Sequence, residues 1–338
     1  MSRQSFVIIG NGPAANQAAE SLRNQSDDSK ITILSKDPFR GYLPHLLPDF
    51  ICGSIGEESL YFKPYAYYKD RNISLRLGQK AVGVDFSKRN VVVEHRELIS
   101  FDGLIIATGG KPRIPEYYQL FKDLMLTLKT PVDAKRWISK LKRVDSVLML
   151  GGDLTSLSLT KTLLEMGKQI QFIINEDAFW PVPYGEEIYA TVTERLESKD
   201  VEVVHCNKIR RVAQIDENLI EVETNTCTLR TGAIGAFFGL APDVRFLVRS
   251  GLDIDRGILV DEFLKTRFEG VFAVGDCAQV YHPALRNYWV SIGYRNATTL
   301  GKIAASNLLG SKVEALAKPE SILEVGGVKV NTSWWVEF

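Results

Sequence analysis

The chain has 338 residues, of which 45% are hydrophobic and 24% charged, a composition typical of a soluble globular protein with about two or three domains. Lys and Arg together number 41, as do Asp and Glu, so the charge balance gives no sign of a nucleic-acid or anionic-membrane partner. No apolar run approaches the roughly 18 residues that span a bilayer. A strand-like segment begins almost at the N-terminus, so we expect a cytoplasmic protein without a signal peptide.

The N-terminal segment predicts a strand, a glycine turn, a helix and a second strand. The run SFVIIG ends at Gly10, the helix-like NGPAANQAAESLRN follows, and ITIL is again apolar. Gly10 allows a tight turn, Gly12 lets the backbone approach a phosphate, and Ala15 is small enough for close packing of helix and strand. The spacing G-x-G-x-x-A in this context predicts a dinucleotide site whose pyrophosphate binds at the helix N-terminus.

The middle of the chain repeats this pattern. Residues 38–64 are rich in Pro, Gly and aromatic residues, which predicts irregular loop and short helix. Strands are predicted for residues 73–78 and 81–95, with a turn near residues 88–90, and FDGLIIATGGKPRIP predicts a further strand that ends in a glycine turn. A helix at residues 130–141 precedes SVLMLGGDLTSLSLTKTLLEMGKQIQFII, which repeats strand, glycine turn, helix and strand.

The last third predicts further strands and one long helix. GEEIYATVTERLESKDVEVVH predicts a helix running into a strand, and strands continue to GAIGAFFGLAPDV. FEGVFAVGDCAQV predicts a strand that ends at Gly275 and Asp276, and residues 298–309 predict a helix. The cysteines form no Cys-x-x-Cys pair, which excludes a local redox dithiol and a thiolate metal cluster; they are Cys52, Cys206, Cys227 and Cys277.

Three motifs occur in the order found in one protein family: VIIGNGPAANQAAE, FDGLIIATGGKPRIP and GILVDEFLKTRFEGVFAVGDCA. Together they resemble the two-dinucleotide-binding-domain flavoproteins of the pyridine nucleotide–disulfide oxidoreductase superfamily. The segment DPFRGYLPHLLPDFICG is most similar to the nitrite reductase flavin domain and the rubredoxin or ferredoxin reductase branch. The resemblance covers residues 5–310 and implies an FAD cofactor, with Asp276 holding the flavin ribityl chain.

The resemblance implies an α/β fold with two Rossmann-like, doubly wound three-layer domains, the second inserted into the first. The FAD-binding domain is expected at residues 1–112 and 240–310, and an NAD(P)-binding-like domain at 113–239. A short C-terminal extension, 311–338, would stand where the family has an interface domain. The residues expected to bind FAD are Gly10, Gly12, Pro13, Ala14, Ala15, Lys36, Ala81, Thr108, Gly109, Gly275 and Asp276.

Two features of the expected FAD site depart from the family. The family usually ends its second strand with an acid that accepts the adenosine ribose hydroxyls, whereas this chain has Lys36 there. Either Asp37 takes over by a one-residue shift, or Lys36 donates to a ribose or phosphate oxygen. The ferredoxin reductase branch also pairs a lysine near the flavin with a glutamate, and the matching positions here resemble Asp49 and Ser158.

Candidate proton donors and thiols near the expected flavin are few. Peroxidase and coenzyme A disulfide reductase members carry a cysteine about where His45 stands. His45 is either a proton donor or a packing residue. Cys52 is expected to be a small buried apolar residue. We therefore assign no catalytic acid or base.

The second glycine turn has lost three features of a nicotinamide dinucleotide site. Gly151 and Gly152 are kept, but Asp153 stands where a glycine approaches the NAD(P)H pyrophosphate, and its charge would repel a phosphate. Ser156 replaces the third glycine and would loosen the contact between helix and strand. Ile174 stands where an acid would bind the NADH ribose. The three losses predict that nicotinamide binding has decayed, so NAD(P)H is a doubtful cofactor.

The leading interpretation is an FAD-dependent oxidoreductase that serves as an electron-transfer subunit of a larger redox complex. We expect an iron–sulfur, ferredoxin-like protein partner, because the scattered cysteines of this chain would not hold a cluster. Trp334, Trp335 and Phe338 either anchor another surface or fold back on their own domain. The alternatives are an NAD(P)H-dependent reductase of the rubredoxin or ferredoxin reductase type and a non-catalytic structural subunit that retains FAD.

Overall fold

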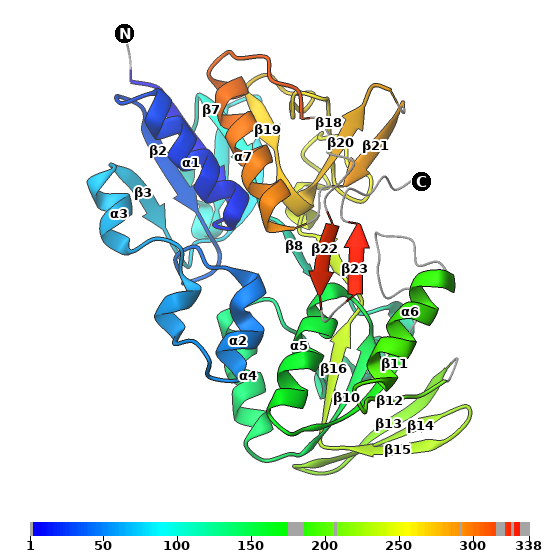
Figure 1. The fold of residues 1–338 in the computed structure, drawn as a ribbon. Coiled ribbons are helices and arrows are strands. Elements are labelled where there is room, and N and C mark those ends of the chain that lie inside the picture. Colours follow the sequence, from blue (N-terminus) through cyan, green and yellow to red (C-terminus); the bar gives the residue numbers. More distant parts are fainter. Residues whose placement is uncertain are drawn as a thin grey trace.

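A computed structural model describes residues 3–174, 186–205, 208–284, 286–290, 293–315, 322–325 and 328–331. Cys206, Trp334, Trp335 and Phe338, which the sequence analysis considered, lie outside these residues. Two five-stranded parallel sheets form the centres of two α/β units (Figure 1). The predicted fold, two Rossmann-like domains built on parallel sheets, is confirmed.

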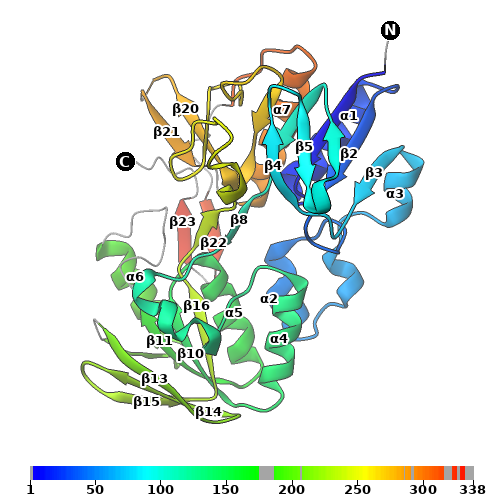
Figure 2. The ribbon, with the colours of Figure 1, turned by 180° about the vertical axis from the view of Figure 1, so that it is seen from behind.

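The first unit has three layers around a sheet of strand order β19-β7-β1-β2-β3. These strands are β1 (Ser5–Ile9), β2 (Lys30–Leu34), β3 (Ile73–Arg76), β7 (Gly103–Ile106) and β19 (Val271–Ala273). Helices α1 (Pro13–Gln25) and α7 (Tyr294–Leu308) cover one face in Figure 1. The other face, seen in Figure 2, is covered by an antiparallel sheet of β4 (Ala81–Asp85), β5 (Asn90–Val93) and β6 (Leu98–Ser100).

The second unit repeats these layers around a sheet of strand order β12-β11-β10-β16-β9. Its strands are β9 (Met125–Leu126), β10 (Ser146–Gly151), β11 (Gln169–Ile174), β12 (Glu202–Val203) and β16 (Ala233–Phe237). One face packs on α4 (Pro131–Leu141), α5 (Leu154–Glu165) and α6 (Glu186–Glu197). The other packs on an antiparallel sheet of β13 (Ile209–Asp216), β14 (Leu219–Thr224) and β15 (Thr228–Thr231).

Alternating side chains of β10 build the two cores of the second unit. Val147 and Met149 are fully buried against the helices, while Leu148 and Leu150 are fully buried against the antiparallel sheet. A continuous apolar run is required because a central parallel strand is covered on both faces. Because both faces of this strand are apolar, one layer of helices and one antiparallel sheet are needed to cover them.

The remaining elements surround and connect these sheets. The first unit also contains a mixed sheet of β18 (Ile258–Val260), β20 (Ala278–His282) and β21 (Asn287–Val290), in which β18 and β20 pair in parallel and β20 and β21 antiparallel. Two short α-helices lie in the loop region after β2, namely α2 (Leu47–Ile51) and α3 (Tyr65–Asp70). The 3₁₀ helices are η1 (Pro44–Leu46), η2 (Glu57–Leu60), η3 (Glu94–Arg96), η4 (Glu116–Leu124), η5 (Arg245–Leu247) and η6 (Gly275–Cys277).

Two strand pairs lie where the units meet. β8 (Gly110–Pro112) and β17 (Leu240–Pro242) pair antiparallel where the chain passes between the units. The domain boundaries expected beside them, after residue 112 and before residue 240, remain a prediction. A hairpin of β22 (Ile322–Val325) and β23 (Val328–Asn331) lies beside α5 and α6. Among the described helices, none combines the length and the apolar composition needed to cross a membrane.

Small residues let α1 and α7 approach each other closely. Ala14, Ala15, Ala18 and Ala19 are buried on α1, and a Cβ atom placed on Gly301 of α7 would lie 2.2 Å from the carbonyl oxygen of Ala14. The backbone contact at this crossing therefore requires glycine at position 301. This packing places the N-terminal end of α1 beside the middle of α7.

Candidate functional site

The first glycine turn is shaped by two glycines with different surroundings. Gly10 has a φ of 116°, and a Cβ atom there would lie 2.1 Å from the carbonyl oxygen of Ala107. A side chain is therefore excluded by both conformation and contact. At Gly12 no described atom lies within 4 Å of the position a Cβ would take. Gly12 is also the N-cap of α1 and makes no side-chain cap, so the first amides of the helix face open space.

This open space is part of a cavity of about 840 Å³ that lies mainly in the first unit and reaches Lys129 and Asp133 of the second. Ten of the eleven residues expected to bind FAD line it: Gly10, Gly12, Pro13, Ala14, Lys36, Ala81, Thr108, Gly109, Gly275 and Asp276. The eleventh, Ala15, is fully buried and does not line the cavity. Its small side chain serves the packing of α1, the role that the spacing argument gave it.

The cavity carries groups that fit a dinucleotide. The hydroxyl of Thr108 is buried and has no hydrogen-bond partner among the described residues. Gly109, the next residue, has a φ of 64° and no described atom within 4 Å of a possible Cβ. An unpartnered hydroxyl, an open glycine and the free amides of α1 suit a ligand rich in phosphate and hydroxyl oxygens. The residues present therefore fit FAD.

Lys36 lies two residues after the end of β2 and forms an ion pair with Asp243, and both line the cavity. The side chain of Asp37, which follows, also lines the cavity, and partial burial raises the pKa of its carboxyl. The sequence analysis considered Lys36 and Asp37 but not Asp243. No motif identified Asp243, because it follows β17, more than 200 positions from Lys36 in the chain.

A second ion pair crosses the cavity at Asp276. The amine of Lys129 lies 3.8 Å from the Asp276 carboxylate, and both side chains are mostly buried. Lys129 precedes the capping box of α4, in which Thr130 accepts from the amide of Asp133 and the Asp133 carboxylate accepts from the amide of Thr130. Sequence reasoning missed Lys129; the only available signal was the Thr-x-x-Asp cap beside it.

Tyr42 joins this wall of the cavity. Its hydroxyl donates to the carbonyl oxygen of Lys129 at 3.0 Å, and burial raises the pKa of its phenol. The contact ties the loop after β2 to the start of α4. The two units therefore meet along one side of the cavity.

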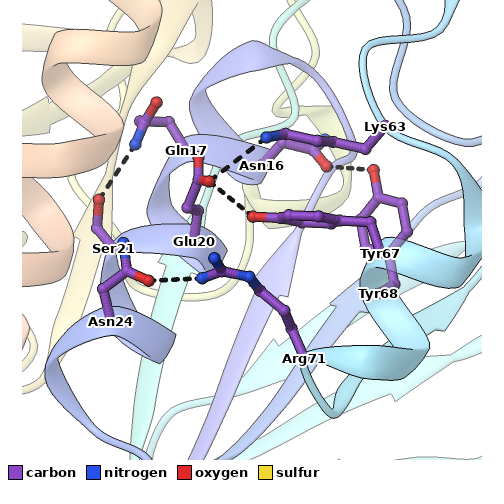
Figure 3. A network of polar contacts seen from close by, with 9 residues as sticks. All are labelled: Asn16, Gln17, Glu20, Ser21, Asn24, Lys63, Tyr67, Tyr68 and Arg71. Carbon is purple, nitrogen blue, oxygen red and sulfur yellow. Dashed lines mark hydrogen bonds and ion pairs between the residues drawn. The ribbon is translucent and has the colours of Figure 1, made fainter.

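A polar network fixes the other side of the loop region to α1 (Figure 3). Tyr68 of α3 donates to the Asn16 side chain at 2.6 Å, and Tyr67 donates to Glu20 at 2.7 Å. The Asn16 amide in turn donates to the carbonyl oxygen of Gly12 at 3.1 Å. A chain of hydrogen bonds thus runs from α3 to the glycine turn that lines the cavity.

His45 and Cys52 do not line the cavity. The His45 ring packs edge to face on Tyr294, with 5.6 Å between the ring centroids. Partial desolvation lowers the pKa of His45, and the nearby charge of Asp49 opposes the shift. Cys52 is partly buried, and its thiol lies 3.3 Å from the carbonyl oxygen of Asp49. The packing role considered for His45 is thus visible, and the expectation that Cys52 is buried holds only in part.

The second glycine turn is arranged differently from the first. Gly151 has a φ of 107°, and a Cβ there would lie 1.9 Å from the carbonyl oxygen of Phe237. Asp153 is the N-cap of α5, and its carboxylate accepts from the amides of Ser156 at 2.9 Å and Gly239 at 3.0 Å. The pKa of Asp153 is raised to about 6 because burial outweighs the hydrogen bonds from these amides.

Ser156 and Ile174 complete this comparison. Ser156 is fully buried, and its hydroxyl donates to the carbonyl oxygen of Asp153 at 2.6 Å. The serine therefore adds a contact within the turn. The expectation that it loosens the contact between helix and strand remains a prediction. Ile174 ends β11 and is 8% exposed. It presents an apolar side chain where an acid would bind a ribose.

Comparison with known proteins places the chain among flavoprotein relatives. The family model described as pyridine nucleotide-disulphide oxidoreductase matches residues 4–296. The rhodocoxin reductase of Rhodococcus erythropolis is 25% identical over 96% of this chain and 78% of its own length. The rubredoxin-NAD(+) reductase of Pseudomonas putida is 25% identical over 96% of this chain and 85% of its own length.

The fold is also similar to solved structures. The covalent putidaredoxin reductase–putidaredoxin complex contains a chain that is 20% identical, with a TM-score of 0.84, over 96% of this chain and 79% of that chain. At this identity the likeness concerns the fold alone. The Pseudomonas relative is named for NAD(+), so the comparisons give no support to the expectation that nicotinamide binding has decayed.

Proposed function

The chain belongs to the pyridine nucleotide-disulphide oxidoreductase family and is an FAD-dependent oxidoreductase, and on this premise we propose a specific role for it. Its flavin exchanges electrons with an iron–sulfur protein, and its nicotinamide site is weakened. The observation that carries the proposal is the Asp153 carboxylate bonded to the amides of Ser156 and Gly239. When bound, FAD would supply the redox chemistry, because a flavin can exchange electrons singly or in pairs.

The FAD site of this proposal is the cavity of the first unit. The open amides of α1 and Gly12 would hold the pyrophosphate, and Thr108 and Asp276 would hold hydroxyl groups of the cofactor. Lys129 balances the charge of Asp276. The FAD-binding domain would comprise residues 1–112 and 240–310, with the nicotinamide-binding-like domain between them.

The two glycine turns differ in the group that accepts hydrogen bonds from the N-terminal amides of the helix that follows. In the first turn the N-terminal amides of α1 have no side-chain cap. In the second turn the Asp153 side chain already accepts from the Ser156 amide near the N-terminus of α5. An incoming pyrophosphate would have to displace this carboxylate and would meet its negative charge. The chain therefore provides its own anion at the place where a dinucleotide would bind.

The partner is inferred from chemistry and from the relatives. The four cysteines of this chain are scattered, so a cluster would lie on a second protein. The Pseudomonas relative is named for rubredoxin, and the similar solved structure contains putidaredoxin. An iron–sulfur protein is the class of partner that these names and the one-electron chemistry of FAD have in common.

A conventional NAD(P)H-dependent reductase is the second candidate. The name of the Pseudomonas relative favours it, and the β10–α5–β11 unit keeps its glycine at position 151. In this case the Asp153 side chain would rotate away when the dinucleotide binds. The two candidates share FAD and the protein partner and differ in the source of electrons.

The partner is tested by single-turnover kinetics. The FAD-loaded protein, reduced with dithionite under anaerobic conditions, is mixed with an oxidised [2Fe–2S] ferredoxin or with rubredoxin, and the flavin and cluster bands are followed. Electron transfer that slows as salt rises would support the proposal. Cluster-free ferredoxin is the control. Transfer to neither protein, together with rapid reoxidation by NAD(+), would contradict it.

A further inference from the structure

After β2 the chain has a positively charged lysine where a dinucleotide site of this type usually has an acid. The acid at this position normally accepts hydrogen bonds from the adenosine ribose, but an amine has only donors. Lys36 occupies the position here and lines the cavity. Ribose hydroxyls also need an acceptor, so another group must supply it if the adenosine is recognised in the usual way.

A carboxylate stands beside this lysine. Asp243 lines the same cavity and forms an ion pair with Lys36, and the Asp243 side chain is 21% exposed while that of Lys36 is 50% exposed. The amide of Asp243 donates to the carbonyl oxygen of Gly109 at 2.9 Å, which fixes its backbone to a second cavity-lining turn. The acid is thus held at two points, through its backbone and through its side chain.

We propose that Asp243 is the acceptor for the adenosine ribose hydroxyls of FAD and that Lys36 is the positioning residue that aims it. The inference rests on the FAD site of the proposed function. A carboxylate that pairs with Lys36 through one oxygen keeps further lone pairs for a ribose hydroxyl. The lysine also neutralises the acid, so the pair adds no net negative charge near the pyrophosphate.

Asp37 is the competing acceptor. It lines the cavity too, beside the positive charges of Lys36 and Lys129 as well as the negative charges of Asp243 and Asp133. No ion pair with Asp37 is found among the described residues, whereas Asp243 holds the amine of Lys36. The geometry therefore favours Asp243, and the experiment below separates the two.

The test measures flavin affinity of the cofactor-free protein by flavin fluorescence. The probes are FAD, its analogue with 2′-deoxyadenosine, and FMN, which lacks the adenosine. We expect wild type to bind FAD about tenfold more tightly than the deoxy analogue, the usual value of a charged hydrogen bond. Asp243→Ala should lose this discrimination and leave FMN affinity unchanged. Lys36→Met should lose part of it.

Two further variants keep the outcome interpretable. Asp253→Ala breaks an exposed ion pair with Arg267 away from the cavity and should retain full discrimination. The double variant Lys36→Glu with Asp243→Lys reverses the pair and should restore discrimination if either single change disturbs folding. Thermal unfolding of each cofactor-free variant monitors the fold.

The outcomes separate this inference from the proposed function. Retained discrimination in Asp243→Ala, or its loss only in Asp37→Ala, would overturn the assignment. If wild type binds FAD but does not distinguish the deoxy analogue, the assignment fails while the flavin function stands. If wild type binds no FAD at all, the proposed function itself fails.

Discussion

Single residues distinguish the two glycine turns. Gly10 and Gly12 are two positions apart, yet one contacts the Ala107 carbonyl and the other faces the cavity. The motif identified both glycines, because their spacing after a strand is set by the backbone conformation of the turn. It did not reveal how Asp153 would act, because the hydrogen bond to Gly239 joins distant parts of the chain.

The two glycines of the first turn should respond differently to alanine. Gly10→Ala forces a Cβ to 2.1 Å from the Ala107 oxygen, so we expect a loss of about 3 kcal/mol or more in the free energy of unfolding. Gly12→Ala should change the stability of the cofactor-free protein by no more than about 1 kcal/mol. Its methyl group would instead occupy the phosphate approach and lower FAD affinity about tenfold or more. Urea unfolding and fluorescence titration measure both effects; equal stabilities for the two variants would contradict the account.

Removing the Asp153 side chain should open the second turn. Asp153→Gly frees the amides of Ser156 and Gly239 and removes a charge, so NADH affinity should rise about tenfold. Glycine is itself tolerated as an N-cap, so the helix should lose only a few tenths of a kcal/mol. Isothermal titration with NADH gives the dissociation constants. Asp145→Ala, which removes a 94% exposed carboxylate of the same unit, is the matched control and should have no effect.

Asp153 should also make stability depend on pH. Its pKa is raised from 3.8 to about 6, so between these values the folded state binds more protons than the unfolded state. The free energy of unfolding therefore falls as pH rises from about 4 to 6, by on the order of 1–2 kcal/mol. Asp153→Asn keeps the cap but cannot ionise, so its stability should lack this decline. If the free energy of unfolding in urea changes with pH in the same way for wild type and Asp153→Asn, the pH dependence does not come from Asp153.

At the scale of elements, periodic patterns predicted most strands and helices. The β10 run was recognisable because its apolar side chains serve two cores. The last helix was expected at residues 298–309 but spans Tyr294–Leu308. Thr298 resembles a helix cap in the sequence, but its hydroxyl bonds back to the carbonyl oxygen of Arg295 within the helix. Gly293, with a φ of 90°, starts the helix without a side-chain cap.

The crossing of α1 and α7 offers a test at this scale. Gly301→Ala would bring a Cβ to 2.2 Å from the Ala14 carbonyl oxygen and push the helices apart. We expect a loss of about 2 kcal/mol or more in unfolding free energy, with weaker FAD binding because Ala14 lines the cavity. Gly56→Ala is the control, since no described atom lies within 4 Å of its Cβ position and its φ is −79°. Similar melting temperatures for the two variants would show that the close approach of Gly301 to Ala14 does not determine the stability of the protein.

At the scale of the whole molecule, the two units share their architecture but differ in the glycine turns that follow β1 and β10. The duplication was evident from the sequence because both copies keep the apolar strand and the glycine that contacts the next strand, Gly10 and Gly151. The ion pairs across the cavity could not be predicted, because Lys36 and Asp243, like Lys129 and Asp276, are brought together only by the fold. The first turn leaves its amides open, whereas the second satisfies them with its own carboxylate.

The central claim is that electrons do not enter through a nicotinamide at this second turn. The most direct measurement is an anaerobic titration of the FAD-loaded protein with NADH and then NADPH, followed through the absorbance of oxidised flavin. The account predicts little bleaching with either nucleotide at micromolar concentration and full reduction by a reduced [2Fe–2S] ferredoxin added afterwards. Rapid, stoichiometric bleaching by micromolar NADH would contradict it and identify a conventional nicotinamide-dependent reductase.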